Sequence, residues 1–263
     1  MKMNRIEKVF QNLKQNNEKA FVPYIMAGDG GLETLAEKIT FLEKAGASAI
    51  EIGIPFSDPV ADGPVIQQAG IRALEAGTTL RGVLAAIAEI RPIVHIPLIF
   101  MTYMNPIMAY GIGNFISDAS RSGVDGLILP DLPAEEEEII APIAERAGIE
   151  IIRLVTLTSP LERIQEIADR GKGFLYAVTV NGITGARKGF TDELGKHLER
   201  VKEVSPIPVL AGFGISEPEH VIEMNKHCDG VIVGSRIIEL FQSGELAKVE
   251  ELIASSKIEE IKL

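Results

Sequence analysis

The sequence predicts an α/β protein of the (β/α)8 class, a TIM barrel, and three observations support this. Eight short runs of β-branched and aliphatic residues alternate with helical patterns. The runs are apolar on both faces, as in parallel strands covered by helices. The length of 263 residues suits one such barrel, and no Pro/Ser/Gly-rich linker divides the chain. We therefore predict a single domain over residues 1–263, with an open doubly wound sheet as the alternative.

The first predicted element is an amphipathic helix that precedes the barrel, within Met1 to Lys14, and its charges distinguish it from a signal peptide. Glycines that follow helical patterns predict left-handed helix ends at Gly46, Gly123 and Gly148. The predicted strands are Phe21–Met26, Ala49–Gly53, Pro97–Thr102, Gly126–Leu129, Glu150–Val155, Phe174–Val178, Pro208–Ala211 and Gly230–Val233.

Two connections differ from the rest. The longest separates the second and third predicted strands and leaves an insertion from Ile54 to Gly77, which is too apolar for a disordered segment. The other, Thr179 to Gly189, follows the sixth strand and has the glycine content of a mobile lid. Long connections at these places predict functional loops.

Composition excludes several classes of function. Acidic residues outnumber basic ones by 37 to 26, which gives a net charge of −11 and no electrostatic footprint for nucleic acid or an anionic membrane. No segment is apolar over the length of a membrane span. The single cysteine, Cys228, can form neither an internal disulfide nor a Cys-x-x-Cys zinc or redox motif. These features predict a cytoplasmic protein.

Barrel enzymes place their sites at the carboxyl ends of the strands. Acidic residues at or after predicted strand ends are therefore candidates: Asp29, Glu51, Asp58, Asp62 and Asp131. Glu51 is the most informative, because flanking isoleucines predict a buried strand, and burial raises the pKa of a carboxylate toward neutrality. The alternatives are a structural ion pair for Glu51 and a turn before Gly63 for Asp62. The histidines precede strands or lie on helices, which disfavours a zinc site or a Ser-His-Asp triad.

Glycines follow the last three predicted strands. They are Gly182 and Gly185, then Gly212 and Gly214, and finally Gly234 beside Ser235. Backbone N–H groups at helix N-termini hold a dianion without cationic side chains. The pattern predicts a phosphate site built from main chain.

Several motifs, in this order, resemble the tryptophan synthase alpha subunit over nearly the whole chain. The strongest is Glu51-Ile52-Gly53-Ile54-Pro55-Phe56-Ser57-Asp58-Pro59-Val60-Ala61-Asp62-Gly63-Pro64. Others are Phe21-Val22-Pro23-Tyr24, Met101-Thr102-Tyr103-Met104-Asn105-Pro106, Leu129-Pro130-Asp131-Leu132-Pro133, Gly182-Ile183-Thr184-Gly185-Ala186 and Gly212-Phe213-Gly214-Ile215.

The resemblance implies a carbon–carbon lyase of tryptophan biosynthesis that cleaves indole-3-glycerol phosphate into indole and glyceraldehyde 3-phosphate, with Glu51 and Asp62 as the acid–base pair. It implies no metal and no organic cofactor. It implies a beta subunit as partner in an alpha2beta2 heterotetramer, faced by Asp58 and Pro59. The substrate-binding residues that it implies are Phe21, Tyr103 and Tyr176 around the indole and Thr184, Gly185, Gly214, Gly234 and Ser235 around the phosphate.

Three alternatives stay open at this point. A stand-alone indole-3-glycerol phosphate lyase would run the same chemistry without a partner. A metal-dependent lyase would use Asp29, Glu51 and Asp131 as ligands. A regulatory subunit without catalysis is disfavoured because both carboxylates and the glycines of the predicted phosphate site are retained.

Overall fold

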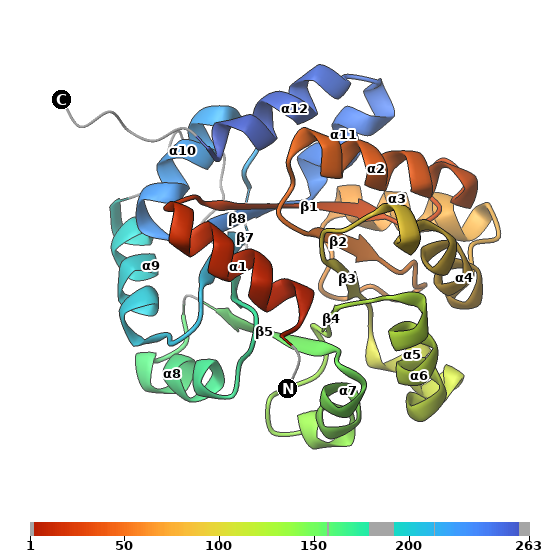
Figure 1. The fold of residues 1–263 in the computed structure, drawn as a ribbon, viewed down its shortest axis with the longest axis horizontal. Helices are drawn as coiled ribbons and strands as arrows, with labels where there is room; N and C mark the ends of the chain where they lie inside the picture. Colours follow the sequence, from red (N-terminus) through yellow and green to blue (C-terminus); the bar gives the residue numbers. More distant parts are fainter. Residues whose placement is uncertain (1–2, 157, 179–191, 213, 258–263) are drawn as a thin grey trace.

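The computed structural model describes residues 3–156, 158–178, 192–212 and 214–257. Its eight parallel strands pair in chain order and close into a barrel, with β1 also paired to β8, which confirms the predicted fold class (Figure 1). Each predicted strand end lies within one residue of the observed end. The strands are β1 Ala20–Met26, β2 Ile50–Gly53, β3 Leu98–Met101, β4 Gly126–Ile128, β5 Glu150–Thr156, β6 Leu175–Val178, β7 Val209–Gly212 and β8 Gly230–Val233.

Helices surround the barrel. The predicted left-handed helix ends are present, with φ of 98° at Gly46, 86° at Gly123 and 77° at Gly148. Such angles favour glycine, which has no Cβ to clash. The helices are α1 Arg5–Asn16, α2 Leu35–Ala45, α3 Pro64–Glu75, α4 Leu80–Ile90, α5 Met104–Tyr110, α6 Ile112–Ser122, α7 Ala141–Ala147, α8 Leu161–Asp169, α9 Asp192–Val204, α10 Pro218–His227, α11 Ser235–Ser243 and α12 Leu246–Ser255. Among the described helices none is long and apolar enough to cross a bilayer.

Strand residues alternate between two apolar layers. In β2, Ile50 and Ile52 belong to the large cluster that joins the barrel wall to the helices, whereas the preceding Ala49 belongs to the cluster inside the barrel. Because side chains alternate along a strand, Glu51 points inward between the two isoleucines. Both faces of the strands are therefore buried, as their continuous apolar sequences predict.

Helix α1 closes the end of the barrel where the strands begin, and in Figure 1 it lies in red over the middle of the barrel. Its buried residues Ile6 and Phe10 pack in the interior cluster, and the Phe10 and Phe174 rings lie 5.2 Å apart. The side chain of Asn4 caps the helix and forms a capping box with Glu7. The helix is thus the floor of the barrel.

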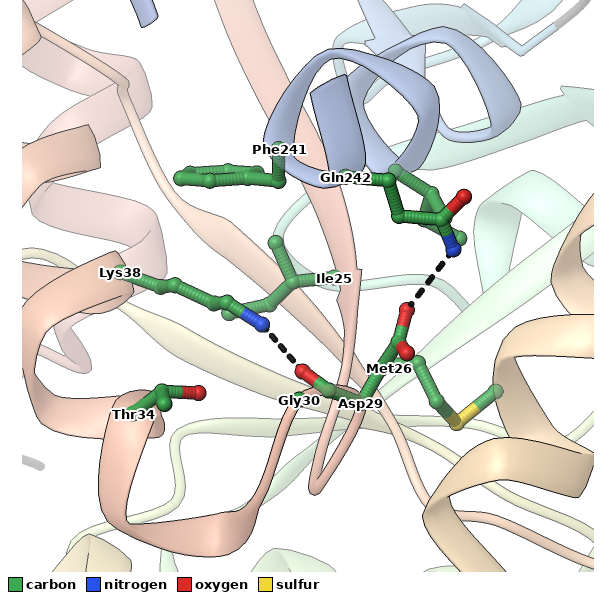
Figure 2. Close-up of a pocket in the computed structure, with 9 residues that line it drawn as sticks. Ile25, Met26, Asp29, Gly30, Thr34, Lys38, Phe241 and Gln242 are labelled. Carbon is green, nitrogen blue, oxygen red and sulfur yellow. Dashed lines mark hydrogen bonds between the residues drawn. The ribbon is translucent and has the colours of Figure 1, made fainter. Parts of the chain in front are cut away.

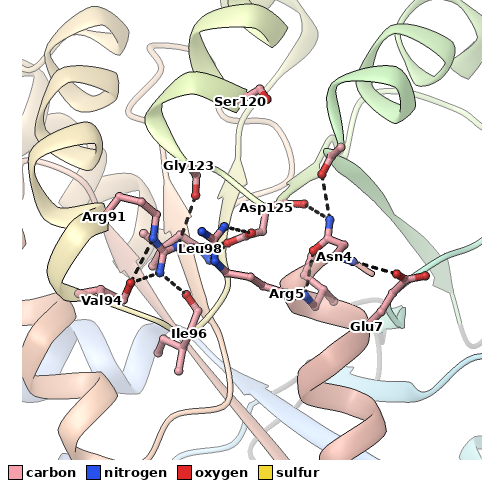
Figure 3. A network of polar contacts seen from close by, with 12 residues as sticks. Asn4, Arg5, Glu7, Arg91, Val94, Ile96, Leu98, Ser120, Gly123 and Asp125 are labelled. Carbon is pink, nitrogen blue, oxygen red and sulfur yellow. Dashed lines mark hydrogen bonds and ion pairs between the residues drawn. The ribbon is translucent and has the colours of Figure 1, made fainter. Parts of the chain in front are cut away.

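A polar network anchors this floor (Figure 3). The buried carboxylate of Asp125 accepts hydrogen bonds from Arg5 at 2.8 Å, from Arg91 at 3.2 Å and from the backbone N–H of Leu98 at 3.0 Å. The Asn4 amide donates to the Asp125 carbonyl oxygen at 3.2 Å. Asp125 therefore has the structural role that its position before the fourth strand predicts.

Candidate active site

Glu51 lies in the barrel interior near the carboxyl ends of the strands, and only 1% of the residue is exposed. It stands between Tyr24 of β1 and Ile99 of β3 in the sheet register. Its Oε2 atom has no hydrogen-bond partner among the described residues, and no described cation forms an ion pair with it. The structural ion pair considered for Glu51 is therefore not found in the described part of the chain.

Burial sets the proton affinity of both candidate carboxyls. Desolvation, followed by the nearby charge of Asp62, raises the pKa of Glu51 to about 8. Desolvation raises the pKa of Asp62 to about 6, against a hydrogen bond from the Tyr103 hydroxyl that lowers it. At pH 7 Glu51 is mainly protonated and Asp62 mainly ionised, which are the states that a proton donor and an electrostatic stabiliser need.

The insertion after β2 brings Asp62 to Glu51. It folds against the start of α5, where the Tyr103 hydroxyl accepts a hydrogen bond from the Ala61 N–H at 3.2 Å. The Phe56 and Tyr103 rings are 5.4 Å apart. The buried Oδ1 of Asp62 has no partner among the described residues, so this oxygen does not serve the turn. If Asp62 only formed the turn before Gly63, the burial of its Oδ1 would have no explanation.

Tyrosines surround the two carboxyls. Tyr24 is buried and Tyr176 is half-buried, and after desolvation the charges of Glu51 and Asp62 raise the pKa of each phenol. A Cβ on Gly53 would lie 1.9 Å from the Tyr24 hydroxyl oxygen, and one on Gly212 would lie 2.2 Å from Cε2 of Tyr176. Glycine at these two positions makes room for the rings.

Phe21 does not lie in this group. It is fully buried in the cluster between β1 and the helices, together with Ile25. Tyr24 has the opposite orientation and is the β1 aromatic beside Glu51, so the expected lining role of Phe21 is corrected to Tyr24. The alternation of side chains along the strand could have identified Tyr24 from the sequence, because Tyr24 lies an even number of residues from the inward Ala20 and Val22.

Part of the predicted phosphate site falls within the described residues. Ser235 begins α11 directly after β8, and no side chain caps the helix at Gly234. Gly214 has φ of 45°, and among the described residues, its chain neighbours aside, no atom lies within 4 Å of a Cβ built there. Arg236 donates to the Ser216 carbonyl oxygen at 3.2 Å and so ties α11 to the segment after β7. Thr184 and Gly185 lie outside the described residues.

The remaining acidic candidates have other partners. Asp29 forms a bidentate pair with Arg72, with N···O distances of 2.7 and 2.9 Å. Both carboxylate oxygens of Asp131 accept from the Met104 N–H, at 3.1 and 3.0 Å, and so cap α5. Asp29 and Asp131 therefore do not join Glu51. In the described ranges no three acidic, histidine or cysteine side chains are placed to share a metal ion.

Asp58 and Pro59 precede Asp62 in the insertion, and the Asp62 N–H donates to the Pro59 carbonyl oxygen at 3.1 Å. Asp58 is exposed and accepts a hydrogen bond from the Ser57 hydroxyl, and Pro59 is half-buried. Val60 beside them is 83% exposed. An exposed apolar side chain at the tip of a loop that carries a site residue is typical of a contact surface.

Comparisons with known proteins agree on one family. A family model described as tryptophan synthase alpha chain matches residues 10–262. A tryptophan synthase alpha chain of Bacillus anthracis (strain CDC 684) is 54% identical over 260 residues, 99% of each chain. A crystal structure of a tryptophan synthase alpha chain from Legionella pneumophila has a TM-score of 0.88 at 35% identity and covers 97% of each chain. A chain of Mycobacterium tuberculosis tryptophan synthase has a TM-score of 0.89 at 33% identity, over 98% of this chain and 100% of that one.

Proposed function

The chain belongs to the tryptophan synthase alpha chain family, and from this premise we propose that Glu51 and Asp62 are its acid–base pair. The reaction is the cleavage of indole-3-glycerol phosphate to indole and glyceraldehyde 3-phosphate, in tryptophan biosynthesis. The match covers the whole chain, which does not favour the stand-alone lyase. The observation that carries the assignment is the buried, unpartnered Oε2 of Glu51 beside the charge of Asp62.

The chemistry requires a proton at C3 of the indole, because an indolyl carbanion is a poor leaving group. Glu51, with its pKa raised to about 8, carries that proton at pH 7 and gives it to C3. The resulting Glu51 carboxylate takes the proton of the side-chain hydroxyl. The hydroxyl oxygen then forms the aldehyde C=O, the bond to C3 breaks, and its electrons restore the neutral indole. One carboxyl thus returns to its starting state.

Asp62 stabilises the cation that forms in between. Protonation at C3 places positive charge on the ring nitrogen, and an ionised carboxylate facing the ring N–H lowers the energy of that state. The hydrogen bond from Tyr103 favours the ionised form of Asp62. Tyr24, Tyr103 and Tyr176 supply the largely apolar walls of an indole pocket, where charge interactions are stronger than in water.

The substrate phosphate is held by main chain. No side chain of the described residues caps the start of α11 at Gly234 and Ser235, which leaves its N–H groups for an anion, and Gly214 lies on the neighbouring segment after β7. The sequence resemblance assigns Thr184 and Gly185 to the same site. Anchoring the phosphate far from C3 orients the ring at no cost to the chemistry.

The partner is the tryptophan synthase beta subunit, which consumes the indole. We assign the exposed Asp58 and Pro59 region to that interface, in an alpha2beta2 complex, because it continues directly into Asp62 and could transmit partner binding to the site. A cytoplasmic location is supported by the only cysteine, Cys228, which is buried as a free thiol with its pKa raised to about 11.

Indole release from indole-3-glycerol phosphate, followed with the full chain with and without a beta subunit, tests the assignment. Glu51→Gln should lower kcat by at least about 1000-fold, the upper range for general acid–base catalysis, and Asp62→Asn by about 100-fold or more. Glu75→Gln, on the exposed side of α3, is the matched charge control and should behave as wild type. Turnover by Glu51→Gln within tenfold of wild type would remove Glu51 from this role.

A further inference from the structure

A cavity of about 290 Å³ lies outside the barrel wall, between the end of β1, the start of α2 and the last turn of α11 (Figure 2). Ile25 of β1 lines it, whereas its neighbour Tyr24 points to the interior beside Glu51. The wall formed by β1 therefore separates this cavity from the carboxyl pair. This cavity is therefore not part of the candidate active site.

Part of the lining is apolar. Ile25 and Ile238 are almost fully buried, and Phe241 adds an aromatic face from α11. A cavity of this size exceeds the volume of a few water molecules, about 30 Å³ each in the liquid. Its apolar lining favours an apolar body of the size of a phenyl ring over bulk water.

Together with Arg72, which stands behind the lining, the charged groups at this cavity sum to one positive charge. The Asp29 carboxylate is neutralised by its bidentate pair with Arg72. The ammonium of Lys38 lies 5.8 Å from the centre of the Phe241 ring, and it donates a hydrogen bond to the neutral Asp29 carbonyl oxygen. The other acid that acts on Lys38 is the exposed Glu37, and burial lowers the Lys38 pKa. A half-buried cation in this setting favours an anion.

One cationic donor faces one end of the cavity. A Cβ built on Gly30 would lie 3.6 Å from Nζ of Lys38 and 3.8 Å from Oγ1 of Thr34, so both side chains border Gly30. The Thr34 hydroxyl donates to the Gly31 carbonyl oxygen at 2.9 Å, which leaves the Lys38 ammonium as the donor for a ligand. Figure 2 shows Lys38 and Thr34 on the same side of the cavity, with the Phe241 ring above them and Gln242 opposite. Thr34 also precedes α2, whose positive dipole end adds to the attraction for an anion.

We propose that this cavity binds a small monocarboxylate with an apolar body, at a site separate from the carboxyl pair. The carboxylate lies against the Lys38 ammonium, and the apolar body against Ile25, Ile238 and Phe241. One excess positive charge matches a monoanion, whereas a dianion such as a phosphate monoester would keep one negative charge without a partner in a half-buried site. The ligand would contact α11 one or two turns after Ser235.

Isothermal titration of the full chain with phenylacetate, a small aromatic monocarboxylate, tests the proposal. Wild type should bind one equivalent with a dissociation constant of about 1 mM or below, the range open to a ligand of this size. Neutral phenylacetamide should bind at least tenfold more weakly to the same wild-type protein. This pair of ligands needs no variant and is independent of folding effects.

Variants of α2 locate the site. Lys38→Met removes the charge and keeps the apolar stem, and it should weaken phenylacetate binding at least tenfold. Lys38→Arg should retain the binding. Lys44→Met is the matched control, because Lys44 is exposed on the same helix and is not in the cavity lining, and it should bind as wild type. Absent binding, equal affinity for acid and amide, or unchanged binding by Lys38→Met would each overturn the proposal, whatever the outcome for Glu51.

Discussion

Two carboxyls are buried at opposite ends of the same barrel, and their surroundings are opposite. Asp125, 4% exposed, lies at the floor and is paired with two arginines and a backbone N–H. Glu51, 1% exposed, lies near the mouth with one oxygen unpartnered among the described residues. The two carboxyls are about equally buried but differ in their partners. Asp125 is hydrogen-bonded, whereas Glu51 has an oxygen with no partner among the described residues.

The difference separates stability from function. The paired Asp125 carboxylate holds α1, the end of α4 and β3 together, because removing it leaves the guanidinium of Arg91 buried without a counter-charge. A buried carboxyl without a cation keeps its proton to higher pH and can release it to a ligand. Asp125 therefore stabilises the fold at the floor of the barrel, whereas the buried Glu51 lowers the free energy of unfolding near the mouth.

Asp125→Ala should give the largest loss of stability. It leaves the Arg91 guanidinium, whose side chain is 11% exposed, without its carboxylate, so the unfolding free energy should fall by about 3 kcal/mol or more. Urea unfolding followed by circular dichroism measures this. Glu145→Ala, in an exposed pair with Lys172, is the control and should cost less than about 1 kcal/mol. A small loss in Asp125→Ala would show that the network is incidental.

Glu51→Gln should change stability in the opposite direction. The Glu51 pKa rises from 4.5 in the unfolded chain to about 8 in the fold, so the unfolded state releases its proton first and unfolding becomes easier as pH rises between these values. Glu51→Gln has no such proton to release, so its unfolding free energy does not fall in this way as pH rises. Its unfolding free energy should match that of wild type near pH 4.5 and exceed it by about 5 kcal/mol above pH 8. Unfolding curves at several pH values test this, and a variant less stable than wild type at pH 9 would contradict the burial account.

The pH profile of kcat/KM should be a bell between the two pKa values. Activity should fall tenfold per pH unit below about 6 as Asp62 gains a proton, and above about 8 as Glu51 loses its own. The substrate phosphate also titrates near pH 6, at about the value of a phosphate monoester. Tyr103→Phe distinguishes the titration of Asp62 from that of the substrate phosphate. Without the hydrogen bond that lowers the Asp62 pKa, the acid limb of the profile should move to higher pH. An unmoved limb would assign it to the phosphate.

Arg5→Met should have the smallest effect. The Arg5 side chain is 46% exposed, and its pair with Asp125 is screened by water, so its loss should cost less than about 1 kcal/mol. Thermal unfolding of Arg5→Met beside wild type measures it. A loss as large as that of Asp125→Ala would mean that Arg5, and not Arg91, supplies the main neutralising charge.

The fold and part of the site follow from local sequence. Apolar runs predict every strand end to within one residue, and Gly46, Gly123 and Gly148 mark helix ends, because these signals are short-range. Position within or after the second strand also selects Glu51 and Asp62. It does not distinguish them from Asp29 and Asp131, which the tertiary contacts assign to an ion pair and a helix cap. The error at Phe21 came from matching a motif without the inward parity of the strand.

The sequence by itself determined the barrel, the order of its strands and the acidic residues at their ends, because periodicity and turn chemistry act between near neighbours. Only the tertiary structure decided which carboxyls are left without a cation, which aromatic ring faces Glu51, and that a charged cavity lies beyond the β1 wall. The physical reason is that desolvation and pairing depend on groups distant in the chain, such as Tyr103 beside Asp62 and Arg91 beside Asp125.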